Sequence, residues 1–279
     1  MSVSEKTKMY ILSLGYIEND VALNLLLHNQ GTVRDKHKVS DWHRVPSICL
    51  LIIHPKLGRI LVDTGSHPDA MNGYWPKHTR DSIPLIRKKE DMLDYRLGEL
   101  NLTPKDIDLL ILSHLHLDHA GGLCYFAGTK AGRKVIAHAD EIKQALFDTY
   151  MSQSSPANGY ILSDFYGVEG IRFDPLLEST SLAEDIEIIW LPGHTIGTLG
   201  VMVHLENSGT IIFTSDAINA EENIYPETRL SAVFYDSLNV LNTTNKIRWL
   251  QRRYNARLIY GHDMNQFKTL PLSPNNYYD

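Results

Sequence analysis

The sequence contains few of the features that mark secreted, membrane-spanning or nucleic-acid-binding proteins. Cys49 and Cys124 are the only two cysteines in 279 residues, which gives no sign of a disulfide scaffold and fits a reducing cytoplasm. No segment approaches about 18 consecutive apolar residues, and the charged residues 1–8 are not followed by an apolar stretch long enough for a signal peptide. We therefore expect neither a membrane span nor a signal peptide. The net charge of −6, without a long Lys/Arg block, argues against a nucleic-acid partner.

The length and composition are those of an ordinary globular protein. Hydrophobic residues make up 43% of the chain and charged residues 22%, and 279 residues are ample to bury a core. We find no internal repeat, low-complexity tract or linker. The sequence therefore predicts a single domain over residues 1–279.

Histidine is concentrated in the stretch Ser113–Gly122, directly after an apolar run that is typical of a buried strand. His114 and His116 are two residues apart, so an extended backbone can point both the same way. Asp118 and His119 follow on a turn. The spacing indicates two neighbouring metal ions, one bound by His114 and His116 and the other by Asp118 and His119. Imidazole and carboxylate ligands favour zinc, with Fe, Mn or Co as alternatives.

Further metal-ligating side chains follow strands in the last third of the chain. The predicted strands 186–191, 210–215 and 257–261 are followed by His194, Asp216 and His262. Ligands gathered at the ends of adjacent strands are what a catalytic cleft on an α/β scaffold requires.

The remaining segments are predicted from periodicity and turn residues. Strands are expected at 9–15 (ending at Gly15), 48–53, 59–62 and 134–138, and helices at 91–102, 139–150 and 237–254. The connection 16–45 and the insertion 151–182 are expected to line a substrate pocket. The histidines outside the clusters lack ligand spacing and are interpreted as solvated or structural: His28, His37, His43, His67, His78 and His138.

The motif His114-x-His116-x-Asp118-His119 resembles the signature of the metallo-β-lactamase superfamily. The resemblance covers nearly the whole chain and implies an α/β fold, the αβ/βα sandwich of two mixed sheets flanked by helices. It implies seven ligands: His114, His116 and His194 for the first metal, Asp118, His119 and His262 for the second, and Asp216 bridging the two. It also makes Asp63, in Asp63-Thr64-Gly65, a residue that orients a metal-binding imidazole.

Within the superfamily the chain is similar to the N-acyl homoserine lactonases. Asp216 occupies the place where true β-lactamases have cysteine, and His116 the place where the flavo-di-iron branch has a carboxylate. The resemblance implies a hydrolase that opens N-acyl homoserine lactones or a related small lactone through a metal-bridging hydroxide, with Asp118 as catalytic proton shuttle. One position departs from the pattern: those lactonases commonly place a tyrosine three residues after the bridging aspartate, and here that position is Asn219. Tyr225 lies further along and is a weak substitute.

Other functions share this ligand set. A glyoxalase-II-like thioesterase would usually bring a basic C-terminal segment, whereas residues 269–279 are short and acidic. A nuclease would want a basic face. A non-catalytic metal-binding protein is disfavoured by seven intact ligands. The resemblance also suggests a homodimer that uses residues 66–83.

Overall fold

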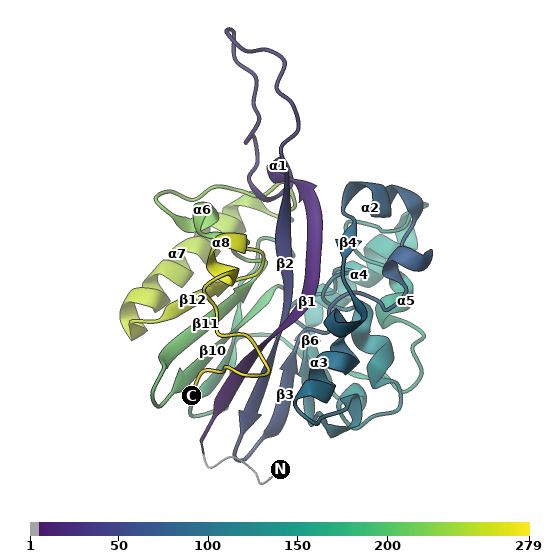
Figure 1. Cartoon of the computed structure of the whole chain (residues 1–279), viewed down its shortest axis with the longest axis vertical. Coiled ribbons are helices and arrows are strands. Elements are labelled where there is room, and N and C mark those ends of the chain that lie inside the picture. Colours follow the sequence, from purple (N-terminus) through teal and green to yellow (C-terminus); the bar gives the residue numbers. More distant parts are fainter. Residues whose placement is uncertain (1–5) are drawn as a thin grey trace.

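The computed structural model describes residues 6–279 and contains two β-sheets that face each other, with helices on both outer sides (Figure 1). In spatial order the first sheet consists of β4 (Leu85–Ile86), β1 (Lys8–Asp20), β2 (Trp42–His54), β3 (Gly58–Val62), β5 (Leu109–Ile111), β6 (Val135–His138) and β7 (Phe173–Leu176). The second consists of β12 (Arg257–Tyr260), β11 (Gly209–Ser215), β10 (Leu199–Leu205), β9 (Ile186–Trp190) and β8 (Thr180–Ala183). Both sheets mix parallel and antiparallel pairs.

Different helices cover the two sheets. The α-helices are α1 (Val21–Asn24), α2 (Lys77–Ser82), α3 (Leu93–Glu99), α4 (Ala139–Met151), α5 (Leu162–Phe165), α6 (Glu221–Ile224), α7 (Ser237–Tyr254) and α8 (Met264–Phe267). Short 3₁₀ helices occur at Ala70–Asn72, Lys89–Asp91, Pro104–Asp106, Gly121–Phe126 and Ala131–Arg133. Helices α3, α4 and α5 pack on the first sheet, and α6 and α7 pack on the second (Figure 1).

Strand β2 shows why the sandwich forms, because it buries side chains on both faces. Leu50 packs with Phe213 of β11 in the core between the sheets, whereas Leu51 packs with Leu97 of α3. Burying each such side chain contributes about 1.5–3 kcal/mol, so a strand that is apolar on both faces favours cover on both. The predicted αβ/βα sandwich is therefore confirmed.

Several predicted boundaries were wrong. Strand β1 does not end at Gly15 but continues to Asp20, because a register shift between Ser13 and Tyr16 absorbs the glycine at φ +94°. Helix α3 is shorter than the expected 91–102. Strand β10 was not predicted, and the insertion 151–182 contains α5 and β7.

The long connection near the N-terminus is shorter than expected. Only residues 25–41 lie outside helices and strands, and they project from the body of the molecule (Figure 1). Val33 and Val39 in this projection are exposed. Among residues 6–279, no helix combines the length and apolarity needed to cross a membrane.

Candidate metal centre

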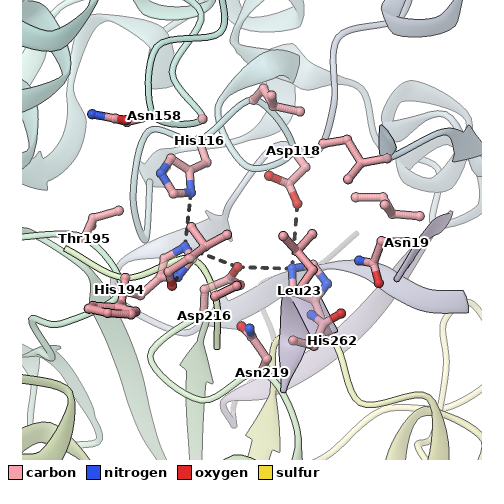
Figure 2. A pocket seen from close by; sticks show the side chains of 18 of the residues that line it. Asn19, Leu23, His116, Asp118, Asn158, His194, Thr195, Asp216, Asn219 and His262 are labelled. Carbon is pink, nitrogen blue, oxygen red and sulfur yellow. Dashed lines mark hydrogen bonds and ion pairs between the residues drawn. The ribbon is translucent and has the colours of Figure 1, made fainter. Parts of the chain in front are cut away.

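The seven predicted ligands come together where strands of both sheets end. His114, His116, Asp118 and His119 lie in the segment after β5 of the first sheet. The other three, His194, Asp216 and His262, follow β9, β11 and β12 of the second. Figure 2 shows five of these side chains, His116, Asp118, His194, Asp216 and His262, turned toward one centre.

The donor atoms form three overlapping groups in which all atoms lie within 4.8 Å of one another. The groups are His114 with His116 and His194, His114 with His119 and Asp216, and Asp118 with His119 and His262. The first and last match the two sets that the resemblance implied.

Asp216 lies between the two sets. Its Oδ2 is 3.1 Å from Nε2 of His262 and 3.5 Å from Nε2 of His194, and its Oδ1 is 3.3 Å from Nε2 of His119. Asp118 joins the second set, with Oδ2 3.7 Å from Nε2 of both His119 and His262. A carboxylate that reaches both sets has the position of a bridging ligand.

The buried donor atoms fit metal ions. Within residues 6–279, His114 Nε2, His119 Nε2 and Asp216 Oδ1 have no hydrogen-bond partner although each is buried. Buried polar atoms are nearly always satisfied, so three unpaired atoms in one cluster indicate a missing partner. Imidazole nitrogen and carboxylate oxygen are suitable ligands for divalent ions of the zinc type. The cluster is a site for two metal ions.

Hydrogen bonds orient the imidazoles of His194 and His262 through Nδ1, the ring nitrogen that does not face the cluster. His194 Nδ1 donates to the carbonyl oxygen of Val233 at 3.1 Å, and His262 Nδ1 donates to that of Pro46 at 2.9 Å. Because a carbonyl can only accept, Nδ1 must carry a proton, which leaves Nε2 as the nitrogen that can bind a metal. His116 instead directs Nδ1 inward, 3.1 Å from His194 Nε2.

Asp63 supports the second set, as expected from the sequence. Its Oδ2 accepts from Nδ1 of His119 at 2.9 Å, and its Oδ1 accepts from the backbone N–H of Ser113 at 2.7 Å. The Ser113 hydroxyl also donates to Asp63 and lies 3.0 Å from Nδ1 of His114. One buried carboxylate therefore orients His119 directly and His114 through a hydroxyl.

The electrostatics of the cluster favour positive charge beside Asp216. Burial alone would raise the pKa of Asp216, but His262 and His119 outweigh it and hold that pKa well below its usual value. Burial lowers the pKa of His262, yet Asp216 and Asp118 overcome this and raise it to about 9. At His114 the raising effect of Asp216 is smaller than the opposing effects, so burial and the neighbouring imidazoles hold its pKa well below the usual value.

Glu141 is a site residue that the sequence analysis missed. It is fully buried in the first turn of α4, where Oε1 accepts from the backbone N–H of Leu115 at 2.9 Å and from the Tyr160 hydroxyl at 3.1 Å. Its Oε2 accepts from the backbone N–H of Gly197 at 3.1 Å. Leu115 lies between two ligands and Gly197 follows His194, so one carboxylate ties both ligand-bearing segments together.

A cavity of about 550 Å³ opens onto the cluster. The donors His116, Asp118, His194, Asp216 and His262 line it, together with residues 158–160 of the insertion and Leu23 and Asn24 of α1. The two predicted pocket-lining segments therefore do contribute. Asn219 also lines the cavity, whereas Tyr225 donates to Gln251 on α7 and is not among the lining residues.

His138 lies outside the cluster. Its side chain accepts from the backbone N–H of Asp140 at 3.2 Å and so caps the start of α4, and its ring stacks on Trp190. His67 stacks on Tyr74. The structural interpretation of these two histidines agrees with their contacts.

Comparison with known proteins gives the class. The sequence profile of the metallo-beta-lactamase superfamily matches residues 44–262, so the chain belongs to that superfamily. The chain is 31% identical over 284 residues to N-acyl homoserine lactonase AiiB of Agrobacterium fabrum, covering 98% of this chain and 99% of the relative. It is 27% identical over 237 residues to N-acyl homoserine lactonase AiiA of Bacillus thuringiensis subsp. kurstaki, covering 82% and 86%.

Solved structures share the fold. An N-acyl homoserine lactone hydrolase with the product N-hexanoyl-L-homoserine at its catalytic metal centre superposes with a TM-score of 0.78 at 21% identity, covering 98% of this chain and all of that one. AidC, described as a dizinc quorum-quenching lactonase, superposes with a TM-score of 0.65 at 18% identity, covering 95% and 90%.

Proposed function

We propose that this protein is a metal-dependent hydrolase that opens the lactone ring of N-acyl homoserine lactones. The observation that carries the proposal is the pair of adjoining donor sets, joined by Asp216, at a cavity of about 550 Å³. Similarity to N-acyl homoserine lactonases along 98% of the chain supports the choice of substrate.

The ligand sets assign a place to each metal. His114, His116 and His194 would hold one ion, Asp118, His119 and His262 the other, and Asp216 would contact both. We propose zinc, because of the ligand types and the similarity to a dizinc lactonase, with Fe, Mn or Co as alternatives. When bound, two divalent ions polarise a carbonyl oxygen and lower the pKa of a water molecule.

Asp118 is the proposed proton carrier. Its side chain is 16% exposed and lines the cavity, whereas those of His194 and His262 are only 5% and 8% exposed. A carboxylate at the cavity wall can take a proton from the attacking water and deliver it to the leaving alkoxide.

The cavity wall would orient the rest of the substrate. Leu23, Val45, Ile83 and Phe234 line it. An apolar wall beside the donors would hold an acyl chain and exclude water from the reacting carbonyl.

The test is ring opening by the metal-loaded protein, followed as acid release. The panel contains short- and long-chain N-acyl homoserine lactones, a simple γ-lactone, an aromatic lactone and a glutathione thioester. We expect turnover of acyl homoserine lactones that His116→Ala abolishes. His37→Ala is the matched control, because His37 is exposed in the projecting segment 25–41, does not line the cavity and should leave the rate unchanged.

The other outcomes separate the alternatives. Turnover of the thioester alone would make the protein a glyoxalase-II-like thioesterase. Failure to open any ester or thioester with two metals bound would point to a non-catalytic metal-binding protein.

We further propose that the chain is a single domain, resides in the cytoplasm and forms a homodimer through residues 66–83. Light scattering of the metal-loaded protein tests the dimer, and a monomer mass would contradict it.

A further inference from the structure

One wall of the cavity is apolar and is built by the N-terminal strands. Ile17 lies on β1 and pairs in register with Val45 of β2, and both line the cavity. Leu23 of α1 and Ile83 complete this surface, which we call the apolar wall: Ile17, Leu23, Val45 and Ile83. Its position at the donor cluster suits an apolar substrate tail.

Asn19 interrupts the apolar wall with a polar group. It is two residues from Ile17 on β1, so both side chains lie on one face of the strand and both line the cavity. Asn19 is only 4% exposed, and its Oδ1 has no hydrogen-bond partner in the described part of the chain. A buried acceptor without a partner, at the wall of a cavity, requires a donor from whatever fills that cavity.

The position of Asn19 relative to the metal-binding residues indicates which part of a substrate would contact it. Figure 2 shows Asn19 on the side of the cavity occupied by Asp118 and His262, away from His194. We consider a substrate whose reacting carbonyl lies at the metal-binding residues and whose tail lies on the apolar wall. The group that connects its lactone ring to its tail would therefore pass Asn19.

We propose that Asn19 is a specificity-determining residue whose Oδ1 accepts a hydrogen bond from an N–H group between the lactone ring and the apolar tail. The inference rests on the proposed function and adds a selection rule to it. Lactones whose connecting group carries an N–H are preferred over lactones of the same shape that lack it, because the latter leave a buried acceptor unpaired.

Asn219 provides a contrast within the same cavity. Its Oδ1 is also without a partner among residues 6–279, but its side chain points toward Asp216 (Figure 2). Its backbone carbonyl accepts from the N–H of His262 at 2.8 Å. Asn219 therefore belongs to the metal end of the cavity, where every lactone places its ring.

The experiment compares two substrates on three proteins. The substrates are N-hexanoyl homoserine lactone and the analogue in which CH₂ replaces the amide N–H. The proteins are the wild type, Asn19→Leu, which removes the acceptor at similar volume, and Asn219→Leu as matched control. The readout is kcat/KM for ring opening.

We expect the wild type to prefer the N–H substrate about tenfold, the value of one hydrogen bond to a buried acceptor. Asn19→Leu should reduce that preference to about twofold or less. Asn219→Leu should slow both substrates and keep the preference.

Two results would overturn the inference while leaving a lactonase in place. The first is a wild type that opens both lactones at equal kcat/KM, which requires no variant to fold. The second is an Asn19→Leu protein that loses activity equally on both substrates, which would make Asn19 a structural residue. A wild type that opens neither lactone would instead refute the proposed function.

Discussion

Replacing Glu141 with glutamine tests whether a buried carboxylate holds the two ligand-bearing segments together. Each carboxylate oxygen accepts from a backbone N–H, one from Leu115 and one from Gly197, and the Tyr160 hydroxyl adds a third donor. In Glu141→Gln one oxygen becomes an NH₂ group, so a donor faces one of these backbone donors.

The magnitude follows from the loss of these bonds. A buried N–H left without an acceptor costs about 1–3 kcal/mol, and the remaining bonds lose about 1 kcal/mol when the acceptor is no longer charged. Burial raises the pKa of Glu141, so removing its charge recovers part of this. We expect the free energy of unfolding to fall by about 2–3 kcal/mol, and kcat/KM to fall about 10- to 100-fold, because the ligands lose their support.

Urea denaturation of the metal-loaded protein measures the first effect and lactone turnover the second. Glu169→Gln is the control, because Glu169 is exposed and should change stability by less than about 0.5 kcal/mol. If Glu141→Gln unfolds at the same urea concentration as this control, Glu141 does not hold the segments together.

Three further predictions concern metal, protonation and packing. Removing the metals with a chelator should abolish turnover and lower Tm, because a ligand at about 100 times its Kd stabilises the fold by about 2.7 kcal/mol; an unchanged Tm in protein shown by elemental analysis to be metal-free would contradict this. Burial, together with the charge of Asp118, raises the pKa of Asp164 to about 7. The carboxyl of the unfolded chain loses its proton near pH 4, so between about pH 4 and 7 the folded state binds more protons than the unfolded state. The free energy of unfolding of the wild type therefore falls as the pH rises through this range, by as much as about 4 kcal/mol. Asp164→Asn should lack this fall, and urea titrations from pH 5 to 8 in which both proteins change in parallel would refute it. A Cβ at Gly122 would lie 2.2 Å from the backbone oxygen of Thr64, so Gly122→Ala should destabilise the protein by about 2–3 kcal/mol. Gly98 on α3 has open space around it, so Gly98→Ala should stabilise the protein by about 0.5–1 kcal/mol. Equal effects of the two substitutions in thermal unfolding would rule out the packing argument.

The sequence predicted the site better than it predicted the boundaries of the elements. Each group of ligands follows an apolar run within a few residues, and both the run and the ligands are local patterns. Gly15 gives the local signal of a turn, yet β1 passes through it as a bulge, because pairing with β2 on both sides of the shift stabilises the strand. Pairing between distant segments is not visible in a local pattern.

Glu141 and Asn19 show the same limit for function. In the sequence, Glu141 belongs to the acidic first turn expected of a solvated helix start, and Asn19 is one polar residue in a mixed segment. Their roles arise from burial among segments that are distant in the chain. Glu141 accepts from Gly197, and Asn19 shares its cavity with His262, a proximity that only the topology creates.

The division of the donors between the two sheets has a mechanical consequence. Neither sheet alone supplies all the ligands of one metal, so a bound metal ion would link the two sheets across their interface. By thermodynamic reciprocity, whatever loosens that interface must weaken metal binding by the same free energy. A substitution such as Phe213→Ala, which opens the core between the sheets, should therefore release metal to a chelator more readily. The affinity for metal then reports the free energy with which the two sheets pack against each other.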